Sequence, residues 1–351
     1  MLVALVASGA IALVACVPPK ADAPPTTTAA AAPTAARRRS PSTSSTTTST
    51  TTTSTSTTTT SPPTGGSWAQ NGSLGTCTVF PANNPWNRDV SALPVAANSA
   101  NYVAAIAALG GNQKLHADFG GAGAYGIPYI TVPGTQPPVP IDFVAYGSES
   151  DPGPYPIPLA APVEGGSDRH VLAVDRGHCK LYELFAATRG TTRWSADSGA
   201  VFDLTSNALR PEGWTSADAA GLPIFAGLVR YDEVARGHID HALRFTVAQT
   251  QKAYLHPATH WASSSTNANL PPMGLRLRLK ANFDVSTYTG EARVVLNALK
   301  KYGLIVADNG SNWFISGAAD TRWNDTDLNQ LKAVPGNAFE VVDTGEALHH
   351  P

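Results

Sequence analysis

The residue of this chain best suited to acid–base chemistry is Glu183, because it lies in an otherwise apolar stretch, residues 181–185. A carboxyl group in such surroundings is either paired with a cation or has a raised pKa, and a raised pKa makes it a candidate general acid. Glycoside hydrolysis needs two carboxyl groups, about 5 Å apart for retention of configuration and roughly 6.5–9.5 Å apart for inversion. Asp308 and Asp203 are the candidate second carboxyl groups. The alternative is a structural ion pair between Glu183 and an arginine.

Histidines beside charged residues form a second group of candidates. His241 could act as a general base in a pocket, for example in an elimination reaction, and Arg244 nearby is a candidate ligand-binding residue. The alternative for His241 is a buried ring that bonds only to backbone. His238 and Asp240 are two residues apart, so on a strand they could converge on a metal ion. The alternative for these two is a solvated polar face.

Two further sets of side chains are candidates for binding a ligand. His116 and Asp118 directly precede a glycine-rich loop, although a loop of this kind can also use its polar groups to satisfy its own backbone. Trp214 and Trp313 would stack on sugar rings if their faces were exposed. Most tryptophans are mainly buried, so burial in the core is the alternative for both.

The sequence predicts no metal site. His256 and His260 have the i, i+4 spacing of a helical zinc site, but Pro257 lies between them and argues against a helix. The chain also lacks the common signatures of nucleophile elbows, zincins, P-loops and dinucleotide-binding folds. The sequence therefore identifies no cofactor.

The elements that must position these residues are mostly strands. Ten β-rich runs are expected, at residues 125–132, 140–145, 169–175, 179–185, 200–204, 238–247, 274–280, 304–308, 313–316 and 339–342. Helices are expected at 100–109 and 290–302, after Ser99 and Thr289 as N-caps, with shorter ones near 228–236 and 326–332. This pattern predicts a mainly β fold, a β-sandwich or twisted antiparallel sheets with a few peripheral helices.

Turn residues and alternation refine the strand prediction. The turn Arg176-Gly177-His178 predicts a hairpin between residues 169–175 and 179–185. The dipeptide Asn309-Gly310 predicts another hairpin, between 304–308 and 313–316. In residues 274–280, leucines alternate with basic residues, so the two kinds of side chain point to opposite faces of a strand.

Nine short stretches carry a family resemblance. They are residues 115–120 (LHADFG), 125–129, 149–158, 168–175 (DRHVLAVD), 181–185, 213–222, 241–245 (HALRF), 271–280 and 307–311 (ADNGS). On these stretches, which span most of residues 80–345, the chain resembles a family of exported bacterial proteins with no assigned activity. The resemblance implies secretion and carries over no catalytic residue.

The N-terminal residues predict export and a membrane anchor. Residues 1–15 are expected to be a signal peptide, because their apolar run is too short to cross a roughly 30 Å hydrocarbon core. The string Leu13-Val14-Ala15-Cys16 looks like a lipobox, in which Cys16 is lipidated. We therefore expect an extracellular protein anchored to the bacterial cell membrane by lipid, with full secretion as the alternative. Residues 16–66 are rich in Ser, Thr and Pro and predict a disordered stalk.

Residues 67–351 are expected to form a single β-rich globular domain. The whole chain carries a net charge of −2 although its first 66 residues are basic, so this domain is acidic and does not suggest nucleic acid binding. The chain has three cysteines. If Cys16 is lipidated, Cys77 and Cys179 remain and are predicted to form a disulfide, the alternative being two free buried thiols.

Together these features predict a cell-surface domain that acts on polysaccharide as a glycoside hydrolase or lyase. The alternatives are a non-catalytic carbohydrate- or cell-wall-binding module and a structural or adhesive surface protein. The expected partner is an extracellular polysaccharide or cell-wall polymer, with no nucleic acid and with membrane contact only through the lipid anchor. Two carboxyl groups from different elements in a deep cleft would favour the enzyme, and exposed tryptophans on a shallow surface would favour the binding module.

Overall fold

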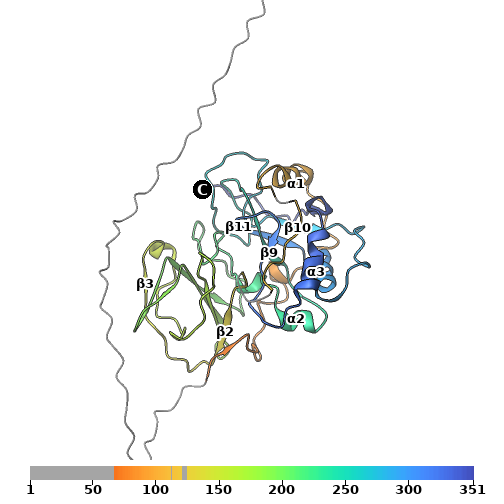
Figure 1. Ribbon diagram of the computed structural model, residues 1–351. Helices are drawn as coiled ribbons and strands as arrows, with labels where there is room; N and C mark the ends of the chain where they lie inside the picture. The colour runs from red at the N-terminus through yellow and green to blue at the C-terminus, as the bar shows by residue number, and fades with distance from the viewer. Residues whose placement is uncertain (1–66, 112, 121–124) are drawn as a thin grey trace, which may run out of the picture. The chain divides into compact units, whose positions relative to one another are not determined.

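The structure is a computed structural model that describes residues 67–111, 113–120 and 125–351 (Figure 1). The predicted signal peptide, the lipidation site Cys16 and the predicted stalk lie outside the described residues. In the part of the chain that is described, no helix is long and apolar enough to cross a membrane.

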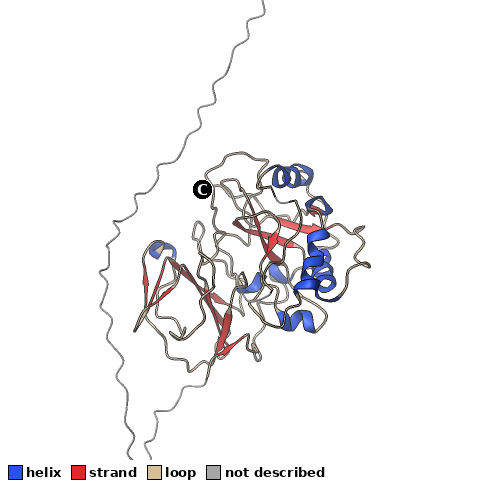
Figure 2. Ribbon diagram, in the orientation of Figure 1, coloured by secondary structure: helices blue, strands red, loops and turns tan. Residues whose placement is uncertain are grey.

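Strands dominate the described residues and form three sheets (Figure 2), so the prediction of a mainly β fold is confirmed. The first sheet has the order β1 (Ala69–Gln70), β2 (Tyr129–Val132), β4 (Val171–Asp175), β5 (Lys180–Phe185) and β8 (Ser198–Asp203). The second has the order β12 (Phe314–Ile315), β9 (Leu243–Val247), β11 (Leu304–Asn309), β10 (Arg276–Leu279) and β13 (Phe339–Val341). The third consists of β3 (Ile141–Phe143), β7 (Trp194–Ala196) and β6 (Thr188–Arg189). Each sheet contains one parallel pair among antiparallel ones.

The first sheet packs against a different sheet on each of its faces. Ile130 and Ala173 belong to the same buried cluster as Trp194 of the third sheet. Leu172 points the opposite way from Ala173 on β4, and it belongs to a larger buried cluster with Phe245 of the second sheet. Side-chain alternation along each central strand therefore supplies two cores. This explains why β4 is buried over its whole length.

The helices are α1 (Ser99–Ala108), α2 (Tyr231–Ala235), α3 (Gly290–Lys301) and α4 (Asp325–Asn329). Thr289 is the N-cap of α3 as predicted, whereas α1 begins at Ser99 itself and has Asn98 as its N-cap. Gly303 follows α3 with a φ of 71°. A Cβ at this position would lie 2.0 Å from the carbonyl oxygen of Leu277, so only glycine fits where the chain turns from α3 into β11.

The hairpin predicted around residues 176–178 is confirmed, because β4 and β5 pair in antiparallel register. Asp175 stabilises the turn: its Oδ1 accepts hydrogen bonds from the backbone N–H groups of Gly177, at 2.8 Å, and His178, at 3.1 Å. Cys179 follows directly and forms the predicted disulfide with Cys77. The disulfide therefore joins the first part of the described chain to the turn between β4 and β5.

The hairpin predicted around Asn309-Gly310 is wrong. β9 lies between β11 and β12, paired parallel to β11 and antiparallel to β12. The connection after β11 passes the end of β9, where Gly310 N–H donates to Val247 O and Trp313 N–H donates to Thr246 O. A local turn signal cannot reveal a strand that enters from a distant part of the chain.

Leucines and arginines alternate on β10 as predicted, and both faces are buried. Arg276 donates to the carbonyl oxygens of Pro85 (2.9 Å) and Tyr302 (2.7 Å). Arg278 donates to three carbonyl oxygens within residues 90–93. The arginine face thus satisfies backbone carbonyls of residues 85–93, and Arg278 also pairs with Glu340 at 2.8 Å. These contacts accommodate two long cations in a buried position.

Candidate functional site

A cavity of about 550 Å³ opens between the ends of the first and second sheets. Phe185 and Ser198 reach it from the first sheet, and Asp308 and Asn309 from β11 of the second. Its other lining residues with functional groups or rings are Tyr146, Asp168, Thr215, Ser216, Asp218, Lys252, His260, Trp261, Ser263 and Ser264. Hydroxyls, carboxyls and aromatic rings thus surround one open space, hereafter called the cleft.

Asp218 and Asp308 bring two carboxyl groups to the cleft from different elements. Asp308 lies near the end of β11 and is half-buried, and its Oδ1 accepts from its neighbour's backbone N–H at 2.7 Å. The side chain of Asp218 is fully buried. Its Oδ2 accepts a hydrogen bond at 3.0 Å from Nε of Arg244, which lies on the neighbouring strand β9. Arg244 also donates to Oγ of Ser316 at 2.5 Å.

The two carboxyl groups differ in how they hold charge. Burial, followed by the charge of Asp218, raises the pKa of Asp308 to about 7, against the effect of Arg244. Burial also raises the pKa of Asp218, which Arg244 opposes through its charge and its hydrogen bond. The pair titrates together, and the direct hydrogen bond from Arg244 favours the negative charge on Asp218 and the proton on Asp308. A pair of carboxyl groups of which one is protonated and the other ionised is the arrangement that acid–base catalysis needs.

A buried ion pair fixes the chain beside Asp218. His170 Nδ1 lies 2.5 Å from Oε2 of Glu164, and His170 Nε2 lies 3.0 Å from the carbonyl oxygen of Ala217. Burial alone would lower the pKa of His170, but the hydrogen bond and charge of Glu164 outweigh it and raise the pKa. The imidazolium can then donate from both nitrogens and hold Ala217 in place.

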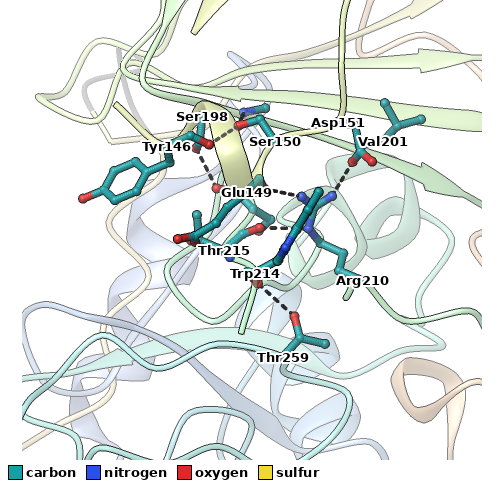
Figure 3. A network of polar contacts seen from close by, with 12 residues as sticks. Tyr146, Glu149, Ser150, Asp151, Ser198, Val201, Arg210, Trp214, Thr215 and Thr259 are labelled. Carbon is teal, nitrogen blue, oxygen red and sulfur yellow. Dashed lines mark hydrogen bonds and ion pairs between the residues drawn. The ribbon is translucent and has the colours of Figure 1, made fainter. Parts of the chain in front are cut away.

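Arg210 lies outside the lining of the cleft and supports one of its walls through a network of polar contacts (Figure 3). Its guanidinium donates to the carbonyl oxygens of Glu149 and Thr215, each at 2.8 Å, and pairs with Asp151. The carboxylate of Glu149 in turn accepts from Thr215 N–H at 3.1 Å. The guanidinium also lies 5.7 Å from the ring centroid of Trp214. These contacts join residues 149–151 to the loop that carries Asp218, so this wall is rigid where it meets the cleft.

Aromatic rings form a stack beside the carboxyl groups. The ring of Trp261 lies 4.8 Å from that of His260, with 24° between the planes, and 6.4 Å from that of Tyr254 with 13°. His260 Nδ1 lies 2.8 Å from the carbonyl oxygen of Ala219, to which it donates. In a neutral ring Nε2 is then the nitrogen that can accept a proton.

The structure separates Glu183 from the cleft. Glu183 is fully buried, and its two oxygens accept from the backbone N–H groups of Ile224 (3.0 Å) and Phe225 (2.8 Å). Burial raises its pKa to about 7, so the expectation of a raised pKa is confirmed. Glu183 is not one of the described residues that line the cleft. Glu183 therefore stabilises the 3-10 turn at Phe225–Gly227. The sequence had predicted that this residue is a catalytic acid.

His241 and Asp203 also lie away from the cleft. His241 is buried, with Nε2 3.1 Å from Oε2 of Glu233 and Nδ1 2.7 Å from its neighbour's carbonyl oxygen. Asp203 is exposed at the end of β8, where its Oδ1 accepts from the N–H (2.9 Å) and the hydroxyl (2.6 Å) of Thr205. These contacts make His241 part of a buried ion pair and Asp203 part of a turn.

The remaining candidates from the sequence have structural surroundings. The ring of His116 stacks on Phe314 at 4.3 Å, and Asp118 bonds to His116 at 3.1 Å and Lys332 at 2.7 Å. Trp313 is fully buried, so neither face of its ring can stack on a sugar. His238 and Asp240 precede β9 on an exposed loop and pair with each other at 3.2 Å.

The sequence therefore identified Asp308 of the cleft and Arg244, which bonds to the cleft residue Asp218, but it did not identify Asp218 or His260. Asp218 lies in the stretch Ser216-Ala217-Asp218-Ala219-Ala220, a carboxyl among small residues. This signal is weaker than the one that singled out Glu183, whose neighbours are mostly large and apolar. His260 was considered only as a partner of His256, but the structure places its ring against the carbonyl oxygen of residue 219, and His256 lies in a different cluster.

Comparisons with known proteins give no family: no family model, curated protein or solved structure matches this chain. The resemblance to exported bacterial proteins therefore stays a prediction. The case for a function rests on the cleft.

Proposed function

We propose that the cleft binds a polysaccharide and cleaves it, with Asp308 as the general acid. The observation that carries this proposal is the carboxyl pair, Asp308 half-buried with a pKa of about 7 and Asp218 held by Arg244, in one open cavity. With a pKa of about 7, Asp308 carries its proton on about half of the molecules at pH 7, and this form can give the proton to the oxygen of a leaving group. Hydroxyl-bearing and aromatic side chains around it match the hydroxyls and apolar ring faces of a sugar.

Two reaction types fit this acid, and they use different partners for it. In hydrolysis, the negative charge of Asp218 would help to keep the proton on Asp308, and Asp168, the further carboxyl of the lining, would act as base or nucleophile. In elimination, Nε2 of His260 would take the proton next to the carboxyl group of a uronic acid while Asp308 protonates the departing oxygen. Lys252, also in the lining, would pair with that substrate carboxylate. In this proposal His260 takes the role that the sequence suggested for His241.

A non-catalytic carbohydrate-binding module is the second candidate. The observation that favours it is the stack of Trp261 on His260 and Tyr254, because a ring fixed by its neighbours is a ready platform for a sugar. In this function the carboxyl groups would accept hydrogen bonds from sugar hydroxyls.

The experiment is to incubate the purified protein with a panel of neutral and uronic-acid polysaccharides. New reducing ends without unsaturation indicate a hydrolase, and unsaturated products indicate a lyase. Retention on an affinity gel without any product indicates the binding module. If no polysaccharide is cleaved or retained, both proposals are wrong.

We also propose that the protein acts outside the cell, where the lipid anchor and the stalk predicted from residues 1–66 would hold it. The Cys77–Cys179 disulfide supports this, because disulfides persist in oxidising compartments. Metabolic labelling with a radioactive fatty acid tests the anchor: label should enter the wild-type protein and be absent from Cys16→Ser. Equal labelling of both proteins would contradict the anchor.

A further inference from the structure

Three side chains from distant parts of the chain converge outside the cleft: Glu212, His256 and His349. One ligand atom from each lies within 4.8 Å of the other two. Oε1 of Glu212 lies 2.7 Å from Nε2 of His256, and the ring centroids of His256 and His349 are 4.3 Å apart. We propose that these three residues bind a zinc ion.

The donor set selects the metal. Two imidazole nitrogens and one carboxylate oxygen are a donor set that Zn²⁺ takes, whereas Ca²⁺ and Mg²⁺ prefer oxygen ligands alone. Three protein ligands leave the fourth tetrahedral position for water. Both His256 and His349 are half-buried and Glu212 is exposed, so an ion can enter and a water can complete the site.

Neighbouring groups already orient two of the ligands. The hydroxyl of Tyr254 donates to Oε2 of Glu212 at 2.6 Å, which leaves Oε1 directed at His256. A carboxylate oxygen of Glu346 lies 3.9 Å from Nδ1 of His256, on the side of the ring away from Glu212. Carboxylates and hydroxyls placed behind metal ligands fix ring orientation and raise affinity in known metal sites.

The position of the site gives the ion a role. His349 and Tyr254 exchange backbone hydrogen bonds, at 2.9 and 3.0 Å, and their rings stack 5.2 Å apart. Tyr254 also stacks on Trp261 of the cleft, and Glu212 lies three residues before Thr215 of the cleft lining. Zinc would therefore clamp the C-terminal segment onto two parts of the chain that shape the cleft. The inference does not depend on what the cleft binds.

Titration of the metal-stripped, full-length protein with ZnCl₂ in a calorimeter tests the site. We expect one zinc ion per chain, and binding at least about tenfold weaker in His349→Ala and His256→Ala. His350→Ala is the matched control, because it removes the neighbouring histidine, which lies outside the cluster, and it should bind zinc as the wild type does. No binding to the wild-type protein would overturn the proposal. Equal weakening in His350→Ala and His349→Ala would also overturn it, since this indicates a chelate of adjacent terminal histidines.

A second measurement separates metal binding from a folding defect. Zinc should raise the melting temperature of the wild-type protein and of His350→Ala, and leave that of His349→Ala unchanged. Without zinc all three proteins should melt at similar temperatures, because His349 is near the surface. Co²⁺ added in place of zinc should give the visible absorption of a tetrahedral site only in the proteins that keep all three ligands. A melting temperature of the wild-type protein that does not respond to zinc would contradict the clamp.

Discussion

Three carboxyl groups, Asp218 and Asp308 at the cleft and Glu183 in the core, have different neighbours, and these neighbours decide what each group can do. Glu183 accepts two backbone N–H groups in the core, and Asp218 accepts the guanidinium of Arg244. Asp308 is half-buried at the cleft and accepts only its chain neighbour's N–H through Oδ1 among the hydrogen bonds described, so it can still give a proton to a ligand. Burial raises the pKa of Glu183 and Asp308 alike, so the value alone could not have told the structural group from the candidate acid.

The raised pKa of Glu183 makes folding stability depend on pH. Burial raises this pKa from 4.5 in the unfolded chain to about 7, so the stabilisation is complete below pH 4.5 and is lost as the pH rises through 7. Glu183→Gln cannot titrate. Between pH 5 and pH 8 the free energy of unfolding of the wild type should therefore fall by about 2–3 kcal/mol relative to that of the variant. Urea unfolding at both pH values measures this, and a difference that stays constant would show that Glu183 is ionised throughout.

At the scale of elements, α2 is fixed to the segment that leads into β9 by buried charged contacts of Glu233. Glu233 bonds to Arg230 at 2.5 Å and to His241 at 3.1 Å. Burial opposes ionisation, but the charges of Arg230 and His241 outweigh it and lower the pKa of Glu233 to about 2. The pair thus contributes stability that is present above pH 4.5 and is lost as the pH falls toward 2.

Glu233→Ala should lower the free energy of unfolding by about 3–5 kcal/mol, because it leaves Arg230 buried without its counter-ion. The adjacent Asp232 is the control. Its side chain is 51% exposed and pairs with Arg322, so Asp232→Ala should cost less than about 1 kcal/mol. Thermal or chemical unfolding at pH 7 compares the two, and equal costs would refute the buried pair as the stronger contact.

The sequence predicted individual elements well because their signals are local. The cap at Thr289 and the terminator at Gly303 define α3, and apolar alternation defines β10 and its neighbours. The order of strands was not predictable in the same way. β9 enters between β11 and β12 from residues about 60 positions earlier, and no turn residue near Asn309 signals its arrival.

The candidate site shows the same contrast between residues that local signals reveal and partners that come from distant parts of the chain. Asp308 could be predicted from its place at the end of a buried strand, and Glu183 from its apolar neighbours. Their different roles depend on partners from distant segments of the chain. Asp308 lies near Arg244 and Asp218, whereas Glu183 bonds to residues 224–225. The zinc ligands show this most clearly, since Glu212 and His349 are separated by more than one third of the chain. Spacing in the sequence carries no signal of such a cluster.

At the scale of the whole molecule, the Cys77–Cys179 disulfide closes a loop with a sequence separation of 102 residues. Cross-linking a loop of this length removes conformational entropy from the unfolded chain, worth about 4–5 kcal/mol in the chain-entropy model. The double variant Cys77→Ser/Cys179→Ser should lose about this much stability to urea unfolding. With reductant present, the wild type should fall to the level of the variant. If reductant leaves the wild type unchanged, the disulfide contributes little.

The central claim, that Asp308 is the acid of a polysaccharide-cleaving cleft, is tested most directly by comparing wild type, Asp308→Asn and Asp203→Asn on any polysaccharide that the panel shows to be cleaved. Asp308→Asn should turn over at least about 100-fold more slowly while it still binds the polymer, and Asp203→Asn, changed at a turn outside the cleft, should match the wild type. Wild-type turnover should also fall as the pH rises through about 7, as the carboxyl of Asp308 loses its proton. Full activity in Asp308→Asn, or a panel in which no polymer is cleaved, would contradict the claim.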